Sequence, residues 1–255
     1  MNRRDFIKSC IAAGIGIWSA SISFSRFFGS GKIQAADLNR VSTSEDRKEN
    51  KMKVMTVFGS QRKGNSEFMA ERFSQIMEGS GAEVTRWYLN ELDYNGCTVC
   101  NACKNGKEEC VLRDDLTPAL NIMKESDILV LATPLYFYDT SSLVKTMVER
   151  WYSYLLPRYY TGENRQTRLP EGKQVVMCVS QGAPVEMFQD FTQRMNSIFQ
   201  MFNTRPAHLL KCGFGIDPNV AENNESLIAE IEKTAELVLA GKDPSTPIAP
   251  YGAPI

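Results

Sequence analysis

The feature that most constrains this chain is the alternation of short apolar runs with segments of helical period, which begins at Lys53. An apolar run of about four to eight residues is typical of a buried strand. Apolar residues three or four apart are typical of a helix packed on a sheet. Together they predict an α/β fold, a doubly wound parallel sheet with helices on both faces. The predicted strands cover residues 54–58, 83–89, 128–132, 175–179 and 207–212.

The helices between these strands have recognisable ends. Gly79 and Gly81 end the first helix, and Asp115 caps the helix that runs to about residue 125. Ser141 or Ser142 caps the next one. The remaining helical segments fall within residues 187–202 and 227–238.

The first 36 residues resemble an export signal. They have a positively charged start, an apolar run and small residues at the end. The run has about 15 residues, whereas a membrane span needs about 20. Arg3-Arg4 followed by Phe-Ile-Lys resembles the twin-arginine (Tat) signal, which implies export of a folded protein to a periplasmic or other extracytoplasmic place. The alternatives are an ordinary secretory signal and an uncleaved signal that tethers the protein to the membrane. The predicted segments are a signal peptide over 1–36, a linker over 37–51, one domain over 52–242 and an extended tail over 243–255.

Composition excludes several kinds of site. The chain has 29 Lys and Arg against 30 Asp and Glu, so no basic excess is available for binding nucleic acid. The one histidine, His208, excludes a metal site built from several histidines. Because it falls in a predicted strand, we expect His208 to be structural.

The ends of three predicted strands suggest a ligand site, since ligands bind at the carboxyl edge of such a sheet. The first strand leads through a polar loop with two glycines, residues 59–66, into a helix, an arrangement that suits a phosphate. An ordinary polar turn is the alternative reading of this loop. The third strand leads into an apolar, aromatic loop over 133–138, and the fourth into a small polar loop over 180–184. The three loops suit a ligand with a phosphate at one end and a planar ring at the other.

At these residues the sequence resembles a family. The motifs are Gly59-Ser60-x-Arg62-x-x-Asn65-Ser66, Thr133-Pro134-Leu135-Tyr136-Phe137, and Leu143-Val144-Lys145-x-x-x-Glu149-Arg150. They resemble the flavodoxin-like NAD(P)H-dependent FMN reductases over about residues 53–211. The resemblance implies a five-stranded flavodoxin-like sheet of order 2-1-3-4-5 with non-covalently bound FMN.

The resemblance also assigns the FMN contacts. Ser60, Arg62, Asn65 and Ser66 would bind the phosphate. The ring would lie against Pro134, Leu135, Tyr136 and Phe137 on one side and Ser180, Gln181 and Gly182 on the other. Many relatives have glycine where Tyr138 stands, so this tyrosine could narrow access to the ring.

Four of the seven cysteines lie close together, at Cys97, Cys100, Cys103 and Cys110. The C-x2-C-x2-C-x6-C spacing is characteristic of thiolates that bind a cubane cluster. The pattern resembles the iron–sulfur flavoproteins, a branch of the same family in which such cysteines hold a [4Fe–4S] cluster beside FMN. Zinc is one alternative, and free or disulfide-paired thiols are another.

These features predict an exported FMN-dependent oxidoreductase that passes electrons between FMN and a [4Fe–4S] cluster or an external acceptor. No side chain need act as acid or base, so we name no catalytic residue. The expected partners are a redox protein, a quinone or NAD(P)H, and export favours a protein or a quinol over NAD(P)H as donor. The alternatives are an NAD(P)H-dependent FMN or quinone reductase without a cluster, a flavodoxin-like electron carrier, and a binding protein that a metal stabilises and that has no flavin. Aromatic residues over 151–160 suggest a subunit interface, hence a homo-oligomer (dimer or tetramer), or else a loop packed on its own domain.

Overall fold

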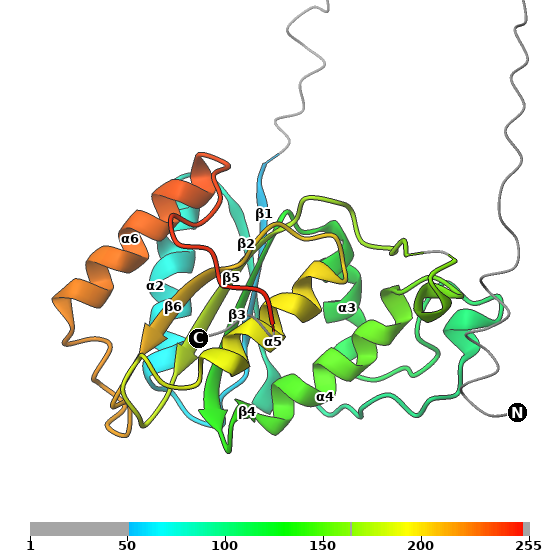
Figure 1. Cartoon of the computed structure of the whole chain (residues 1–255), viewed down its shortest axis with the longest axis horizontal. Coiled ribbons are helices and arrows are strands. Elements are labelled where there is room, and N and C mark those ends of the chain that lie inside the picture. The colour runs from blue at the N-terminus through cyan, green and yellow to red at the C-terminus, as the bar shows by residue number, and fades with distance from the viewer. Residues whose placement is uncertain (1–50, 164, 252–255) are drawn as a thin grey trace, which may run out of the picture. The chain divides into compact units, whose positions relative to one another are not determined.

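Five parallel strands form the centre of the fold in the computed structural model, which describes residues 51–163 and 165–251 (Figure 1). Their spatial order is β2-β1-β3-β5-β6, with parallel pairing between every pair of neighbours. This order confirms the predicted flavodoxin-like arrangement. The strands are β1 (Lys53–Phe58), β2 (Glu83–Tyr88), β3 (Ile128–Tyr136), β5 (Gln174–Ser180) and β6 (His208–Cys212).

Helices cover both faces of the sheet, and the alternation of side chains along β1 shows why. Val54 and Phe58 pack into a buried cluster with α2 and α6, whereas Met55 and Val57 pack into a second cluster with α3, α4 and α5. All four β1 side chains are almost completely buried, as expected for a central parallel strand. The helices are α2 (Asn65–Gly79), α3 (Leu116–Glu125), α4 (Ser142–Arg150), α5 (Gln189–Gln200) and α6 (Glu225–Leu239).

Of two predicted helix caps, the structure confirms the one at Ser141, whereas the side chain of Asp115 does not cap its helix. The Ser141 side chain accepts a hydrogen bond from the backbone N–H of Val144 at 3.3 Å and therefore caps α4. Asp115 stands directly before α3, but its side chain makes no capping bond. Its Oδ2 accepts instead from the backbone N–H of Asp93 at 2.9 Å, which ties the start of α3 to the loop after β2.

The loop expected over 133–138 is in part a strand. β3 continues to Tyr136 and pairs antiparallel with β4 (Asp139–Thr140), a strand that the sequence analysis missed. Phe137 and Tyr138 form the two-residue turn between them, and both have positive φ, 46° and 67°. Such a turn matches the twist of a β-hairpin, so the two residues of β4 can pair directly with the end of β3.

The predicted signal peptide, the linker except residue 51, and the last four residues of the tail lie outside the described residues. Residues 243–251 of the tail contain no helix or strand. Among the residues that the structure describes, no helix combines the length and the apolar character needed to cross a membrane.

Candidate functional site

A cavity lies at the carboxyl edge of the sheet, where β1, β3 and β5 end. Its volume is about 340 Å³. Ten of the eleven residues predicted to contact FMN line it, and they come from three separate segments, at the ends of β1, β3 and β5. These ten are Ser60, Arg62, Asn65, Ser66, Pro134, Leu135, Tyr136, Ser180, Gln181 and Gly182.

The start of α2 forms one end of this cavity. Gly64 stands at the N-cap position, and no side chain caps the helix there. The first turn of a helix has backbone N–H groups without intrahelical partners, so this end suits an anion. Ser66 is buried in this turn, and Arg62 adds a positive charge beside it. Ser60 Oγ accepts from the backbone N–H of Arg62 at 3.3 Å, which holds the short loop in a turn.

Asn65, which the resemblance assigns to the phosphate, has a side chain that also makes structural contacts. Its Nδ2 donates to the carbonyl oxygens of Gly215 at 3.2 Å and Asp217 at 2.6 Å. Its Oδ1 accepts from the backbone N–H of Ala221 at 2.8 Å. The amide is thus occupied by the loop after β6, and Asn65 positions that loop against the cavity.

The loop after β6 is a wall of the cavity that the sequence analysis missed. Gly215, Ile216 and Pro218 line the cavity from this side. A Cβ on Gly215 would lie 3.0 Å from Asn65 Nδ2, a tight contact that would push the two groups apart, so glycine favours the close approach of the loop. The sequence did contain a signal for this wall. Gly213 and Gly215 follow the predicted strand over 207–212, and β6 also ends at the carboxyl edge of the sheet.

The apolar wall consists of Pro134, Leu135 and Tyr136, at the end of β3. Phe137 does not line the cavity: its side chain is 100% exposed at the tip of the β3–β4 turn. Tyr138 stacks edge-on against Phe188, with ring centroids 4.9 Å apart. Of the four apolar residues predicted to contact the ring, three therefore line the cavity.

Gln181 gives the cavity an unused acceptor. The side chain is buried, and its Nε2 donates to the carbonyl oxygen of Pro184. Its Oε1 is buried and has no hydrogen-bond partner within the described part of the chain. A buried acceptor without a partner is costly, and a ligand N–H group would satisfy it. An uncapped helix start, an apolar wall and this acceptor fit a ligand such as FMN, which joins a phosphate to a planar ring.

The four clustered cysteines lie on a loop between β2 and α3. All four are free thiols: Cys100 is exposed, Cys103 is buried, and Cys97 and Cys110 lie between these extremes. Within residues 51–163 and 165–251, no group of three or more Cys, His, Asp or Glu side chains is gathered closely enough to hold a metal ion. The donor set still fits a thiolate-bound cluster in number and chemistry, and the side chains would have to converge on it.

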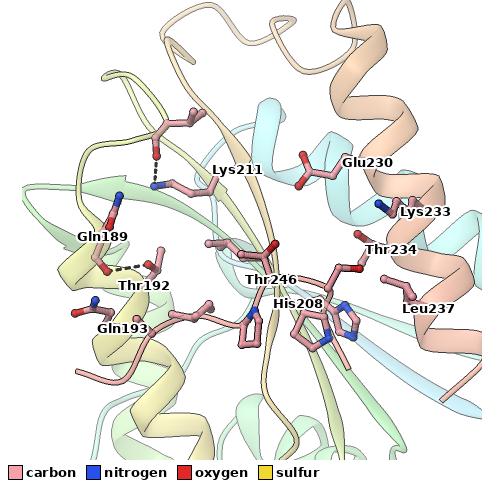
Figure 2. A pocket seen from close by; sticks show the side chains of 17 residues that line it. Gln189, Thr192, Gln193, His208, Lys211, Glu230, Lys233, Thr234, Leu237 and Thr246 are labelled. Carbon is pink, nitrogen blue, oxygen red and sulfur yellow. Dashed lines mark hydrogen bonds between the residues drawn. The ribbon is translucent and has the colours of Figure 1, made fainter. Parts of the chain in front are cut away.

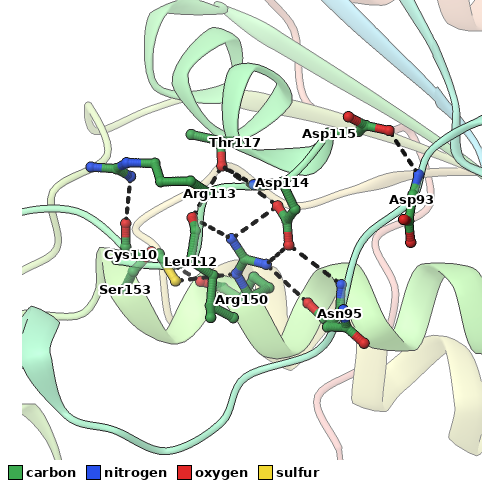
Figure 3. A network of polar contacts seen from close by, with 10 residues as sticks. All are labelled: Asp93, Asn95, Cys110, Leu112, Arg113, Asp114, Asp115, Thr117, Arg150 and Ser153. Carbon is green, nitrogen blue, oxygen red and sulfur yellow. Dashed lines mark hydrogen bonds and ion pairs between the residues drawn. The ribbon is translucent and has the colours of Figure 1, made fainter.

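Cationic side chains support this loop. The Arg150 guanidinium donates from Nε to Cys110 Sγ at 3.2 Å and forms an ion pair with Asp114 at 2.6 Å (Figure 3). Burial disfavours the charged guanidinium, but the bond to Asp114 and the proximity of Cys110 outweigh it and raise the pKa of Arg150. Positive charge beside a thiol favours its thiolate form, which is the form that binds a metal.

Lys104 lies within the cysteine loop itself. Its Nζ donates to the carbonyl oxygens of Tyr152 and Leu155, each at 2.5 Å, and lies 4.0 Å from the centre of the Tyr152 ring. Burial lowers its pKa, and the nearby Cys103 counteracts that effect. Arg168 donates to the carbonyl oxygen of Cys103 at 3.1 Å. The loop is therefore docked on the segment that follows α4.

The aromatic residues after α4 divide into two groups. Trp151 and Tyr154 are buried and pack edge-on against Phe202, as a loop packed on its own domain would. Tyr160 is exposed and contacts Tyr152 and Tyr159. Only this second group is available for an interface.

A separate cavity of about 490 Å³ lies at the outer edge of β6 (Figure 2). His208 lines it, and its Nε2 lies 3.2 Å from the carbonyl oxygen of Lys242. Burial lowers the pKa of His208. Lys211 Nζ donates to the carbonyl oxygens of Val185 and Met187. Both side chains thus hold chain segments together, and His208 has the structural contacts expected of it.

Comparison with known proteins agrees with this arrangement. Residues 52–207 match the family described as NADPH-dependent FMN reductase. An iron-sulfur flavoprotein of Archaeoglobus fulgidus is 30% identical over 168 residues, which cover 66% of this chain and 70% of that protein. An iron-sulfur flavoprotein of Methanocaldococcus jannaschii is 32% identical over 100 residues, which cover 39% of this chain and 51% of that protein. The match thus spans about half the length of this second relative.

Solved structures share the fold at low sequence identity. An FMN-dependent NADH-azoreductase from Bacillus anthracis, in complex with FMN, has a TM-score of 0.55 at 13% identity and covers 73% of this chain and 99% of that one. The NAD(P)H:quinone oxidoreductase from Methanothermobacter marburgensis has a TM-score of 0.51 at 15% identity and covers 73% and 95%. At these identities the likeness is one of fold.

Proposed function

The chain belongs to the NADPH-dependent FMN reductase family, and on that premise we propose that it is an exported FMN oxidoreductase in which a [4Fe–4S] cluster relays electrons to or from a partner. Membership of the family makes it a flavin-dependent oxidoreductase, for which NAD(P)H and quinones are fitting substrates. The observation that carries the FMN assignment is the convergence of ten predicted contact residues on one cavity.

The chain's own residues bind and orient the flavin. FMN, when bound, supplies the capacity to accept two electrons as a hydride and to release them one at a time. The start of α2 and Arg62 would hold the phosphate, and Pro134 and Leu135 would offer an apolar surface to the ring. Gln181 Oε1, which is buried without a partner among the described residues, would be available to accept from an N–H group of the ring. No side chain is required to move a proton for hydride transfer.

The cluster would be held by Cys97, Cys100, Cys103 and Cys110. Such a cluster, when bound, exchanges single electrons. Three observations support this part of the proposal: the C-x2-C-x2-C-x6-C spacing, the similarity to iron-sulfur flavoproteins, and the guanidinium that donates to Cys110.

The twin-arginine resemblance supports export, since that pathway carries proteins that are already folded and loaded with cofactor. NAD(P)H belongs to the cytoplasm, so we propose a redox protein or a quinol as the donor. Rapid reduction of the flavin by NAD(P)H at micromolar affinity would contradict this choice and favour a cytoplasmic type of reductase.

We propose further that the protein is a homo-oligomer, a dimer or tetramer. The exposed Tyr160 and its neighbours Tyr152 and Tyr159 support this, because aromatic side chains are enriched in interfaces. A monomeric mass by light scattering, with flavin bound, would contradict it.

The decisive experiment is anaerobic purification of the full chain followed by a visible spectrum and by iron, sulfide and flavin assays on one sample. Flavin bands with a broad shoulder near about 400 nm and about four irons per chain support the proposal. Flavin without iron leaves a reductase or carrier whose cysteines have another role. A colourless protein contradicts both assignments.

Matched variants then assign the residues. Arg62→Ala should weaken FMN binding about tenfold or more, because a charge-assisted contact is lost, whereas the adjacent Lys63→Ala should change it by less than about threefold. Lys63 does not line the cavity. Cys100→Ser should remove iron, whereas Cys178→Ala, a buried thiol within β5, should leave iron unchanged. Equal effects within either pair would contradict the assignment.

A further inference from the structure

A second hollow adjoins the cavity at the carboxyl edge of the sheet. Its volume is about 720 Å³, within the roughly 300–1,000 Å³ that is usual for small-molecule sites. One side is formed by α2, from the N-cap residue Gly64 to Gln75, and the other side by the segment 218–228, which includes the start of α6. These two helices lie side by side on one face of the sheet (Figure 1). We call this hollow the α2–α6 groove.

The cavity and the α2–α6 groove meet at two residues, Gly64 and Pro218, which line both of them. Gly64 has no side chain, and a Cβ there would lie 3.8 Å from Pro218 Cβ, at the distance of ordinary contact. Glycine therefore keeps free a space at the junction that any other side chain would occupy. Gly64 also stands directly before the first turn of α2, where the phosphate of FMN would be held. A ligand that continues beyond this phosphate would thus pass from the cavity into the groove.

The groove has a positive charge close to the junction. Lys63 precedes Gly64 and lines the groove, whereas its neighbour Arg62 lines the cavity. One cation therefore belongs to each hollow, and the first turn of α2 adds backbone N–H groups that have no intrahelical partners. Two linked phosphates suit this arrangement, because each carries negative charge and accepts charge-assisted hydrogen bonds.

The remaining walls of the groove suit a nucleoside. Glu67 and Glu222 line it, and carboxylates accept hydrogen bonds from hydroxyl groups, as acidic side chains do from the ribose of bound dinucleotides. Phe68 and Ile228 are half-buried there and provide an apolar surface for a planar base. The same carboxylates would repel a further phosphate on the ribose, so the groove favours a nucleoside with free hydroxyls.

We propose that the α2–α6 groove is a subsite for adenylate, so that the protein binds FAD as well as FMN, and FAD more tightly. The inference rests on the proposed function, because the flavin and its first phosphate occupy the cavity already described. The second phosphate would lie beside Lys63, and the ribose hydroxyls would face Glu67 and Glu222. The adenine ring would lie against Phe68 and Ile228.

The test is isothermal titration calorimetry of the full chain, freed of flavin, with riboflavin, FMN and FAD as separate ligands. The series measures first the effect of one phosphate and then the effect of the adenylate half. We expect FAD to bind about tenfold more tightly than FMN, because a charge-assisted contact with Lys63 is added. An adenylate half that stays in solvent would leave the two affinities equal.

Two neighbouring cations give a matched pair of variants. Lys63→Ala should weaken FAD binding about tenfold and should change FMN binding by less than about threefold, since Lys63 lines the groove alone. Arg62→Ala should weaken the binding of both flavins by a similar factor, because Arg62 lines the cavity that both of them occupy.

A second pair tests the apolar part of the groove. Ile228→Asp places a charge where the adenine ring would lie, and it should reduce FAD binding without reducing FMN binding. Ala229→Asp introduces the same charge at the next residue of α6, which is exposed and does not line the groove, and it should leave both affinities unchanged. Unchanged FMN binding also shows that each variant is folded.

The outcomes separate the inference from the proposed function. A parent protein that binds none of the three flavins overturns both. Equal affinity for FMN and FAD, or tighter binding of FMN, overturns the inference alone. A preference for FAD that survives in both Lys63→Ala and Ile228→Asp also overturns it, because the adenylate then lies elsewhere. Loss of the preference in these two variants, with the preference retained in Ala229→Asp, supports the inference.

Discussion

Asn65 Oδ1 and the backbone N–H of Ala221 form a 2.8 Å hydrogen bond between residues 156 positions apart in the chain. With the bonds from Nδ2 to Gly215 and Asp217, it joins the first residue of α2 to the loop after β6. Two walls of the cavity proposed to bind FMN are therefore held together by one amide side chain.

Replacing Asn65 by alanine should lower the free energy of unfolding of the flavin-free protein by about 2–3 kcal/mol. The change removes three hydrogen bonds and leaves the N–H of Ala221 buried without a partner. Urea denaturation checks this. Asn223→Ala is the matched control, because its Nδ2 bond to the Asn219 carbonyl is exposed, and it should cost less than about 0.5 kcal/mol. Equal losses in the two variants would show that Asn65 does not hold the cavity walls.

Replacing Phe137 by glycine should raise the free energy of unfolding by about 1 kcal/mol. Phe137 has a φ of 46°, which is unfavourable for a side chain with a Cβ, and its ring is fully exposed and has no packing to lose. Tyr138→Gly relieves similar strain at a φ of 67° but loses the edge-on contact with Phe188, so its net effect should be near zero. Thermal unfolding of both variants measures these effects. A lower melting temperature for Phe137→Gly would contradict the backbone strain inferred at Phe137.

The buried Lys173 should make stability rise with pH above about 8. Burial lowers the pKa of Lys173 from 10.5 to about 8, and its Nζ donates to Ser126 Oγ at 3.1 Å. Below pH 8 the ammonium is charged in both states, so the cost of burying the charge is fully present. Between pH 8 and 10.5 the unfolded chain keeps a proton that the folded chain has lost, and the free energy of unfolding increases.

Lys173→Met should abolish this rise and stabilise the protein at pH 7 on the order of 1–3 kcal/mol. Urea denaturation at pH 7, 8.5 and 10 of both proteins gives the difference in pH dependence. Lys51→Met changes an exposed lysine and should retain the parent profile. A parallel pH profile for Lys173→Met and the parent would exclude Lys173 as the cause.

Gly59 should not tolerate alanine. A Cβ there would lie 2.1 Å from Val144 Cγ2 and 3.0 Å from the carbonyl oxygen of Ala132. We expect Gly59→Ala to cost about 1–3 kcal/mol, the usual range for overpacking. Gly79→Ala, at the end of α2 with no atom within 4 Å of the new Cβ, should stabilise by up to about 1 kcal/mol. Circular dichroism during heating measures both, and similar melting temperatures would contradict the clash.

The strands and helices could be predicted because their signals are local, whereas the sheet order was predicted from the family resemblance. Alternating burial along β1 and the serine that caps α4 are properties of neighbouring residues. The cavity could be predicted as well, since parallel strands end at one edge and their loops must meet there.

What the sequence analysis missed depends on distant or very short elements. β4 has two residues, too few for a periodic pattern. The outward position of Phe137 results from the hairpin turn that this strand makes possible. Arg150 was visible as part of a motif, but its partners Asp114 and Cys110 lie 36 and 40 positions away, and no local pattern connects them.

Three contacts join the cysteine loop to the segment over 150–168: Arg150 to Cys110, Lys104 to the carbonyl oxygens of Tyr152 and Leu155, and Arg168 to the Cys103 carbonyl. These two stretches are separate in sequence, and we expect them to tolerate transfer to another protein only together. A chimera in which a relative's sequence replaces the cysteine loop should fold well only if the segment over 150–168 is replaced by the same relative's sequence. Insertions that spare both stretches leave these contacts intact.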